Sequence, residues 1–371
     1  MDGGYNSPDM AAVRKVIRAP AEVRCKEELE RLQAWDTFPK PTGWNLSPRA
    51  VEKFLLGDTM LGIRPKYIGD PNRIQVAIAT LASDRALLLV GEPGTAKSWV
   101  SEHLCAAICN NSQLTVQGTA GITEDQIKYS WNYALLMAEG PSDRSLVPSP
   151  VLTAMREGRI ARFEEITRCA SEVQDALISI LSEKAIAIPE LERIEYARRG
   201  FNIIATANTR DRGVNEMSSA LKRRFNFVEL PVLNDLQQEM AVVRQRTQEM
   251  LADHEMPASL PDELVEALVT LFQELRQGQT LDGDQKVRAP STVMSTAEAV
   301  SVLFGGCLLA THFGDGVVNG QDVMRLLVGA IAKEDKRDLE VLTEYLETVA
   351  KTRGGRVWRE FQEGRRWLKS L

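Results

Sequence analysis

A short apolar run leads into a glycine-containing loop that ends in Lys97-Ser98. Ala86–Val90 predicts a buried strand, and the residues that follow Ser98 begin the apolar periodicity of a helix. The loop between them consists of Gly91, Glu92, Pro93, Gly94, Thr95 and Ala96. Backbone N–H groups of such a loop converge at the helix N-terminus and attract an anion. Lys97 can then reach β and γ phosphates, and Ser98 can offer its hydroxyl to Mg²⁺.

One loop position departs from the usual phosphate-loop pattern. The second glycine, expected directly before the lysine, is Ala96, whereas Gly94 lies two residues earlier. A methyl group at this position narrows the approach of a phosphate without blocking it. The loop is therefore still expected to bind phosphate.

Two adjacent carboxylates follow another predicted strand. Ile160–Phe163 ends in Glu164-Glu165, which places both carboxylates at the carboxyl edge of the sheet, where ligands bind in open α/β folds. One carboxylate can hold the water ligands of Mg²⁺, and the other can orient and polarise an attacking water. We assign Glu164 to the metal and Glu165 to the water. The alternative is a charged helix start, where acidic residues are also favoured, and the preceding strand and loop make it the weaker interpretation.

Polar residues near two later strands have two interpretations each. Asn208 follows the predicted strand Phe201–Thr206, where its amide can bind a γ-phosphate or the water, or simply form a turn. Lys222, Arg223 and Arg224 precede the last strand. These cations either complement a helix dipole or supply charge to a phosphoryl group in a neighbouring subunit.

The elements that must position these residues alternate along the chain. Five short apolar runs are separated by helical stretches, which predicts an α/β fold with a parallel sheet covered on both faces by helices. The runs are Ala86–Val90, Leu114–Gln117, Ile160–Phe163, Phe201–Thr206 and Phe227–Leu230. A β-hairpin is predicted between Lys184 and Gly200, before the fourth strand.

After Pro231 the strand patterns fade and helical patterns predict a second, all-helical domain over 235–250, 261–277, 291–309 and 320–333. The predicted organisation is an N-terminal helical extension (1–45), an α/β domain (46–232), a helical domain (233–335) and a basic, aromatic helical tail (336–371). The tail can contact phosphate or a partner, but we favour a helix that docks its aromatic residues back onto the body.

Composition narrows the function classes. The chain has 371 residues, of which 44% are hydrophobic. Its net charge of −6 argues against a protein that mainly wraps nucleic acid, because such a protein usually needs a basic surface. The five cysteines form neither a disulfide framework nor a metal-ligand spacing. The N-terminus has no apolar signal segment, and no run approaches membrane-spanning length, so we expect a cytoplasmic protein.

The order of these motifs resembles the AAA+ ATPases, a family of P-loop NTPases, and most closely their MoxR branch. The resemblance rests on the loop that ends in Lys97-Ser98, on Glu164-Glu165, on Asn208 after its strand and on Arg223-Arg224 before the last strand. It implies an ATP-hydrolysing αβα core with a helical lid, using ATP and Mg²⁺. By this resemblance Lys97 and Ser98 are Walker A residues, Glu164 and Glu165 Walker B residues, Asn208 is sensor 1, and Arg224 is the arginine finger with Arg223 in reserve.

The resemblance also implies a ring, expected to be a hexamer, and remodelling of a protein client, often with a von Willebrand factor A-domain partner. The segment from Gly118 to Glu139 and the hairpin near Pro189 are then the client-contacting parts. Two positions depart from the family pattern. Glu164 stands where Asp is usual, and Thr292 stands where the sensor 2 arginine is expected, with Arg288 as a nearby substitute.

Two other functions stay open at this stage. A nucleic-acid motor would use Arg193, Arg198 and Arg199 near the hairpin, although the acidic total charge and the absence of an aromatic stacking platform oppose it. A nucleotide-dependent binding switch with slow turnover is motivated by Glu164 and Thr292.

Overall fold

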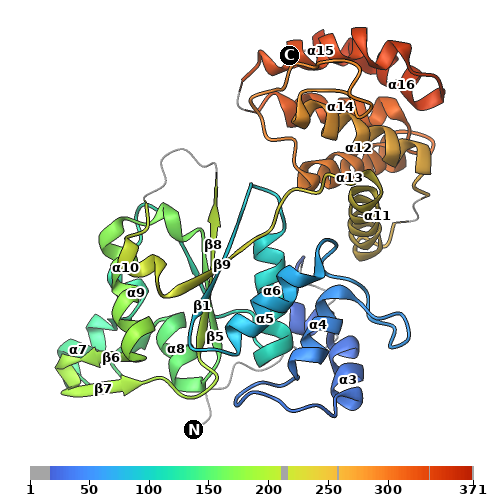
Figure 1. Ribbon diagram of the computed structural model, residues 1–371. Coiled ribbons are helices and arrows are strands. Elements are labelled where there is room, and N and C mark those ends of the chain that lie inside the picture. The colour runs from blue at the N-terminus through green and yellow to red at the C-terminus, as the bar shows by residue number, and fades with distance from the viewer. Residues whose placement is uncertain (1–16, 210–215, 257–258, 334, 370–371) are drawn as a thin grey trace. The chain divides into compact units, whose positions relative to one another are not determined.

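The computed structural model describes residues 17–209, 216–256, 259–333 and 335–369. Contacts divide the chain into two compact units (Figure 1). The first unit comprises residues 1–92 and 96–230, and the second comprises residues 93–95 and 231–371. Residues 1–16 of the expected N-terminal extension lie outside the described part.

A five-stranded parallel sheet forms the centre of the first unit, in the order β2-β5-β8-β1-β9. Its strands are β1 (Ala86–Gly91), β2 (Thr115–Gln117), β5 (Ile160–Glu164), β8 (Asn202–Asn208) and β9 (Phe225–Glu229). The predicted α/β fold with a parallel sheet is confirmed. β9 begins earlier than predicted, because Phe225 is buried and pairs with Ala86.

Helices cover both faces of this sheet. Successive side chains of β1 point to opposite faces, so Leu88 packs in one core with α8 and α9, while Leu87 and Leu89 pack in another with α4, α5 and α6. These helices are α4 (Pro48–Leu56), α5 (Pro71–Leu81), α6 (Lys97–Cys109), α8 (Pro150–Glu157) and α9 (Ser171–Glu183). The short α10 (Ser219–Lys222) precedes β9.

The described residues before 45 pack against the sheet's helices. The helices α2 (Ala21–Arg24) and α3 (Lys26–Trp35) precede α4, and Leu29 and Leu32 are buried in the same core as Leu87. Arg18 and Arg24 donate to the buried carboxylate of Glu102 on α6, at 2.5 and 3.0 Å. This segment thereby fixes the helix that follows the phosphate loop.

Two small hairpins extend the first unit. The predicted one is present as β6 (Ala185–Ile188) and β7 (Arg193–Tyr196), joined by η3 (Pro189–Leu191). The sequence did not predict the second one, β3 (Tyr129–Trp131) with β4 (Leu146–Pro148), because three-residue strands show no readable alternation. The turns η1 (Glu124–Gln126) and η2 (Ile166–Arg168) and the helix α7 (Tyr133–Glu139) complete the unit.

The second unit is helical, as predicted. Its elements are α11 (Leu236–Asp253), α12 (Asp262–Gln277), α13 (Thr296–Phe313), α14 (Gly320–Ile331), α15 (Asp338–Thr348), η4 (Ala350–Thr352), α16 (Arg356–Gly364) and η5 (Arg365–Lys369). The predicted start of α13 near Ser291 is wrong. Ser295 is the N-cap and accepts from the Glu298 N–H, whereas Ser291 bonds to Asp338 instead.

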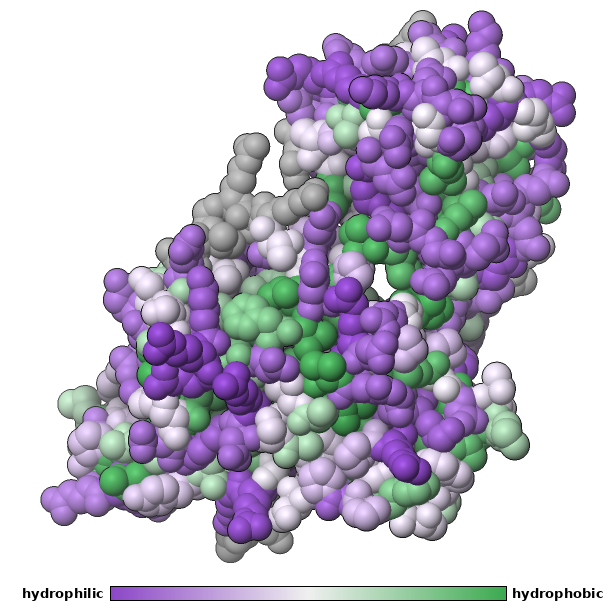
Figure 2. Space-filling view, viewed as in Figure 1, coloured by the Kyte–Doolittle hydropathy of each residue, from purple (hydrophilic) through white to green (hydrophobic). Residues whose placement is uncertain are grey.

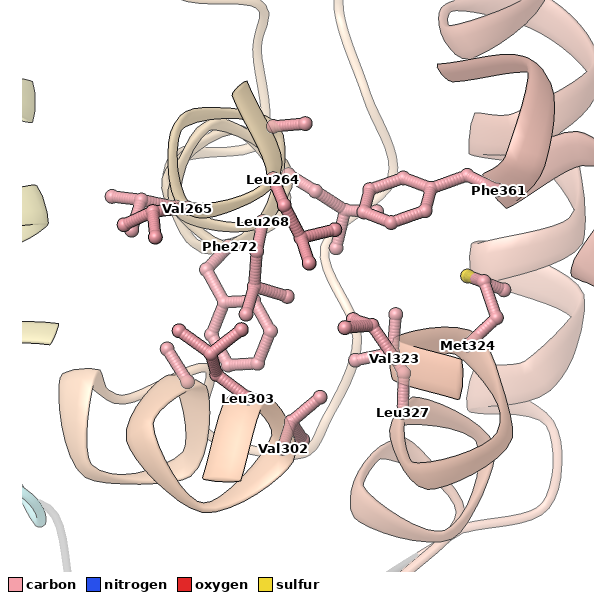
Figure 3. Close-up of a cluster of buried hydrophobic side chains, with 14 of the residues drawn as sticks. Leu264, Val265, Leu268, Phe272, Val302, Leu303, Val323, Met324, Leu327 and Phe361 are labelled. Carbon is pink, nitrogen blue, oxygen red and sulfur yellow. The ribbon is translucent and has the colours of Figure 1, made fainter. Parts of the chain in front are cut away.

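The C-terminal helix α16 docks onto the second unit through its aromatic side. Phe361 is fully buried and extends toward Leu264 and Leu268 of α12 (Figure 3). The surface over α15 and α16 is mainly hydrophilic (Figure 2). These observations agree with the docked-helix interpretation of the tail.

One helix passes the length and composition test for a membrane span, contrary to the expectation that no run approaches that length. Among the described residues this helix is α13, with a mean hydropathy of 1.3. Its buried residues, among them Leu303, Cys307 and Ala310, belong to the hydrophobic core of the second unit. One side of α13 thus packs into that core, and 39% of the helix is buried.

Candidate nucleotide-binding site

The phosphate loop connects β1 to α6 through two residues with positive φ. Gly94 has a φ of 79°, and Ala96, the N-cap residue of α6, has a φ of 63° in the left-handed region. That conformation explains why a glycine is usual at the second position. Ala96 carries no side-chain acceptor for the N–H groups of the first turn, so they remain suited to an anion.

Lys97 begins α6 and is buried, with only 7% of its surface exposed. Its Nζ donates to the carbonyl oxygens of Gly91 at 3.1 Å and Glu92 at 2.7 Å. The ammonium group is thus held beside the loop backbone. A phosphate in the loop would offer it a charged acceptor.

Glu164, the last residue of β5, lies at the centre of a hydrogen-bond network and is 5% exposed. Oε2 accepts from the Ser98 hydroxyl at 2.6 Å and from the Thr206 hydroxyl at 2.8 Å. Oε1 accepts from Arg162 at 2.6 Å and from Ser101 at 2.8 Å. The structure therefore joins the first turn of α6 directly to the carboxylate at the end of β5.

This network keeps Glu164 ionised. Burial by itself would raise the pKa of the carboxyl, but the Arg162 charge and the hydrogen bonds from Ser98, Thr206 and Ser101 outweigh it and lower the pKa below its ordinary value. A buried anion with several donors is available at neutral pH.

Glu165 has a different environment from its neighbour. Its backbone is left-handed, with a φ of 54°, and its N–H donates to the Thr206 hydroxyl at 2.9 Å. Its carboxylate forms an ion pair with Arg168 at 2.8 Å and is partly exposed. Glu165 directly follows β5 and is the N-cap residue of the short 3-10 helix η2, so both the strand-end and the helix-start interpretations describe its position. Partial exposure suits a carboxylate that must meet a water.

Asn208 ends β8, next to the strand that enters the phosphate loop. It pairs in register with Gly91, and the N–H of Thr209 donates to the Gly91 carbonyl at 3.1 Å. Asn208 is therefore a strand residue at the same sheet edge as Glu164. The carboxyl ends of β1, β5 and β8 therefore place Gly91, Glu164 and Asn208 at one edge of the sheet. Arg223 and Arg224 precede β9, at the opposite edge.

The two candidate finger arginines differ in their contacts. Arg224 is half-buried and donates to the Ser182 hydroxyl at 2.9 Å and to the Ala220 carbonyl at 2.6 Å. The second contact is the helix-end interaction that the dipole interpretation predicts. Arg223 is exposed.

The residues present fit a magnesium ion. Mg²⁺ prefers oxygen ligands and is usually bound by one or two carboxylates together with substrate phosphates. The Ser98 hydroxyl donates a hydrogen bond to Glu164, so the lone pairs of its oxygen stay available to a cation. Ser98 and Glu164 would hold the ion with phosphate oxygens, and the ion would neutralise phosphate charge.

Sequence analysis missed three residues of this network, namely Arg162, Thr206 and Ser101. A signal existed for the first: an arginine within a buried strand needs an anionic partner, and Glu164 lies two residues away on the same face. Thr206 is likewise two residues before Asn208 on β8. The bonds from Thr206 and Ser101 to Glu164 come from other elements, which no local pattern reveals.

Thr292, the residue at the expected sensor 2 position, makes its contacts within the second unit. Thr292 is buried, and its hydroxyl donates to the Ile331 carbonyl at 2.8 Å, while its N–H donates to Asp338 at 2.9 Å. Thr292 therefore stabilises the loop before α13. Arg288, the proposed substitute, is exposed.

Comparison with known proteins identifies the family. Residues 86–225 match the model of the AAA domain of the dynein-related subfamily, and residues 237–369 match that of the YehL-like AAA+ ATPase C-terminal domain. The uncharacterized protein YehL of Escherichia coli (strain K12) is 44% identical over 356 residues, which cover 95% of this chain and 97% of that protein. The chain belongs to the YehL-like AAA+ ATPases.

More distant similarities to this AAA+ chain cover less of the sequence. The uncharacterized protein SH1500 of Staphylococcus haemolyticus (strain JCSC1435) is 26% identical over 234 residues, covering 61% of this chain and 84% of that protein. Among solved structures, NtrX from Brucella abortus in complex with ADP has a TM-score of 0.47 at 15% identity, covering 86% of this chain and 70% of that one.

Proposed function

We propose that this AAA+ chain hydrolyses ATP with Mg²⁺ and uses the energy to remodel a protein client in a ring of subunits, as a MoxR-type chaperone. The observation that supports hydrolysis is the bond between Ser98 and Glu164, with Glu165 and Asn208 at the same sheet edge. This arrangement provides a metal site and a partly exposed carboxylate beside it for the attacking water.

A protein client is favoured by the surface of the inserted elements. Tyr133 and Met137 on α7 and Ile194 and Tyr196 on β7 are exposed large apolar residues. Arg193, which a nucleic-acid motor would use, is instead paired with Asp143 at 2.7 Å and with Glu195 at 2.9 Å. We therefore place protein ahead of nucleic acid, with a von Willebrand factor A-domain protein as the proposed partner.

A cytoplasmic location fits the cysteine chemistry. All five cysteines are free and buried, which is compatible with a reducing compartment. We include this location in the proposal.

The decisive experiment is steady-state phosphate release by the wild type and by Glu165→Gln. We expect the variant to bind ATP and to lose turnover by about 100-fold or more, because general base assistance typically contributes that much. Glu172→Gln is the matched control, since Glu172 is an exposed glutamate on α9 of the same unit. Equal turnover by wild type and Glu165→Gln would exclude hydrolysis at this site as the function.

A nucleotide-dependent switch with slow turnover is the second candidate. Two observations favour it: Glu165 is paired with Arg168, and the sensor 2 position holds a threonine that is bonded within its own unit. The same measurement separates the candidates. A wild type that binds ATP tightly but releases phosphate no faster than Glu165→Gln supports the switch.

The client itself can be sought with the same variant. Proteins retained by Glu165→Gln in the presence of ATP, and released after exchange into ADP, are expected to include the client. Stimulation of wild-type turnover by DNA or RNA, abolished by salt, would instead favour the nucleic-acid motor.

A further inference from the structure

Both carboxylates at the end of β5 have an arginine partner supplied by the chain. Arg162 donates to Glu164 at 2.6 Å, and Arg168 pairs with Glu165 at 2.8 Å. The two pairs differ in burial: the side chains of Arg162 and Glu164 are 11% and 7% exposed, whereas those of Arg168 and Glu165 are 50% and 32% exposed. The inner pair is therefore shielded from solvent, and its charges act at close range.

Arg162 is fixed by more than its ion pair. Its Nε donates to the Ser101 hydroxyl at 3.0 Å, and its two terminal nitrogens donate to the carbonyls of Ser112 and Ser98, both at 3.1 Å. The planar guanidinium provides these bonds in a rigid fork. One side chain thus ties the end of β5 to the first turn of α6.

The ion pair between Arg162 and Glu164 affects how strongly the site binds a metal ion. Unpaired carboxylates attract a divalent cation by themselves, whereas a carboxylate with an adjacent fixed cation presents little net charge. Nucleotide phosphates supply the missing negative charge when they occupy the loop.

Building on the proposed function, we propose that Arg162 is a positioning residue that orients Glu164 and makes divalent cation binding at this site depend on bound nucleotide. The permanent charge of the guanidinium suppresses binding of the free ion. The fixed N–H donors of the guanidinium hold the Glu164 carboxylate against Ser98.

The first test uses the wild type alone. Mn²⁺ is the probe for Mg²⁺, and its binding is measured by electron paramagnetic resonance without nucleotide and with ADP. We expect binding with ADP to be at least about tenfold tighter than without it. Equal affinity in the two conditions overturns the proposal.

Two substitutions separate charge from geometry. Arg162→Met removes the charge and is expected to raise the affinity for Mn²⁺ without nucleotide by about tenfold or more. Arg162→Lys keeps the charge and is expected to retain the wild-type dependence on ADP, while losing turnover because Glu164 is less well held. Identical Mn²⁺ behaviour of Arg162→Met and the wild type contradicts the inference.

Arg276→Met is the matched control for loss of a buried ion pair. Arg276 pairs with Glu239 at 2.7 Å in the second unit, with a side chain 10% exposed. We expect this variant to leave Mn²⁺ binding without nucleotide unchanged. If Arg162→Met does not fold, Arg162→Gln, which also removes the charge, replaces it in the Mn²⁺ measurement. A wild type that fails to bind ADP or ATP at all contradicts the proposed function, whereas binding of nucleotide with Mn²⁺ affinity independent of it contradicts only this inference.

Discussion

Ala96 shows how a single residue in the phosphate loop combines function with strain. Its φ of 63° lies in the left-handed region, where a Cβ approaches the following carbonyl oxygen at a cost of about 1–2 kcal/mol. Glycine at this position would avoid this cost. It would, however, lower the free energy of unfolding by about 0.5–1 kcal/mol, because the unfolded chain gains backbone freedom. The two effects oppose each other, and the strain is the larger.

We therefore expect Ala96→Gly to raise the free energy of unfolding by up to about 1 kcal/mol, measured by urea denaturation. Ala134→Gly is the control, because Ala134 is an exposed residue within the right-handed α7 and glycine there costs about 1 kcal/mol. A loss of stability in Ala96→Gly as large as in the control would argue against strain at this position.

Glu164 shows at the same scale why a longer carboxylate is accommodated. Four donors, two from α6, one from β8 and one from β5 itself, surround its two oxygens. Glutamate reaches between α6 and β8, so Ser98 and Thr206 both contact Oε2. The extra methylene relative to the usual aspartate is thus matched by the surrounding donors.

At the scale of elements, Asp338 connects the start of α15 to the loop before α13. Its carboxylate accepts from the N–H and hydroxyl of Ser291 and from the N–H of Thr292. Burial by itself would raise the pKa of Asp338, but these hydrogen bonds outweigh it and lower the pKa below 3.8. The ionised carboxylate is therefore the stabilising form.

We expect Asp338→Asn to lower the free energy of unfolding at pH 7 by about 1–3 kcal/mol, because the donors of Ser291 and Thr292 lose a charged acceptor. A depressed pKa contributes stability above the unfolded value, so the difference from wild type should shrink as the pH falls below 3.8. Unfolding curves from pH 7 to pH 3 measure this. Glu340→Gln, on the exposed side of α15, is the control and should not differ from wild type in this way. If the difference in unfolding free energy between Asp338→Asn and wild type stays constant with pH, the charge of Asp338 has no such role.

At the scale of the whole molecule, the proposed ring follows from the position of the finger candidates. Arg223 and Arg224 lie at the end of α10, before β9, the edge strand of the sheet. An arginine that stabilises the phosphoryl group from a neighbouring subunit requires an assembly.

We expect Glu165→Gln with ATP and Mg²⁺ to sediment as a large assembly.

We expect Arg224→Ala to bind ATP with unchanged affinity while losing turnover by about 1,000-fold, because the transition-state charge loses its arginine. Lys222→Ala is the control, since Lys222 is an exposed cation on the same short helix. If Arg223→Ala loses turnover and Arg224→Ala does not, the finger is Arg223. A monomer at every protein concentration would rule out the ring.

The sequence alone indicated the α/β fold, the phosphate loop and the acidic pair after β5. These features are encoded locally, because a buried parallel strand is a short apolar run and a phosphate loop needs its residues at fixed spacing. Chain order also indicated that strand ends such as Glu164 and Asn208 share one sheet edge. That prediction required only that the strands be parallel.

Tertiary structure decided which side chains surround those residues. Ser98 and Glu164 are 66 positions apart, and Thr206 and Glu164 are 42 apart, so their contacts depend on strand order and helix packing. The same reason explains the start of α13: Ser291 and Ser295 are both good caps locally, and the bond from Ser291 to Asp338 leaves Ser295 as the cap. Local patterns select the elements, whereas long-range hydrogen bonds, formed only after the chain has packed, determine how the phosphate loop is connected to its carboxylate.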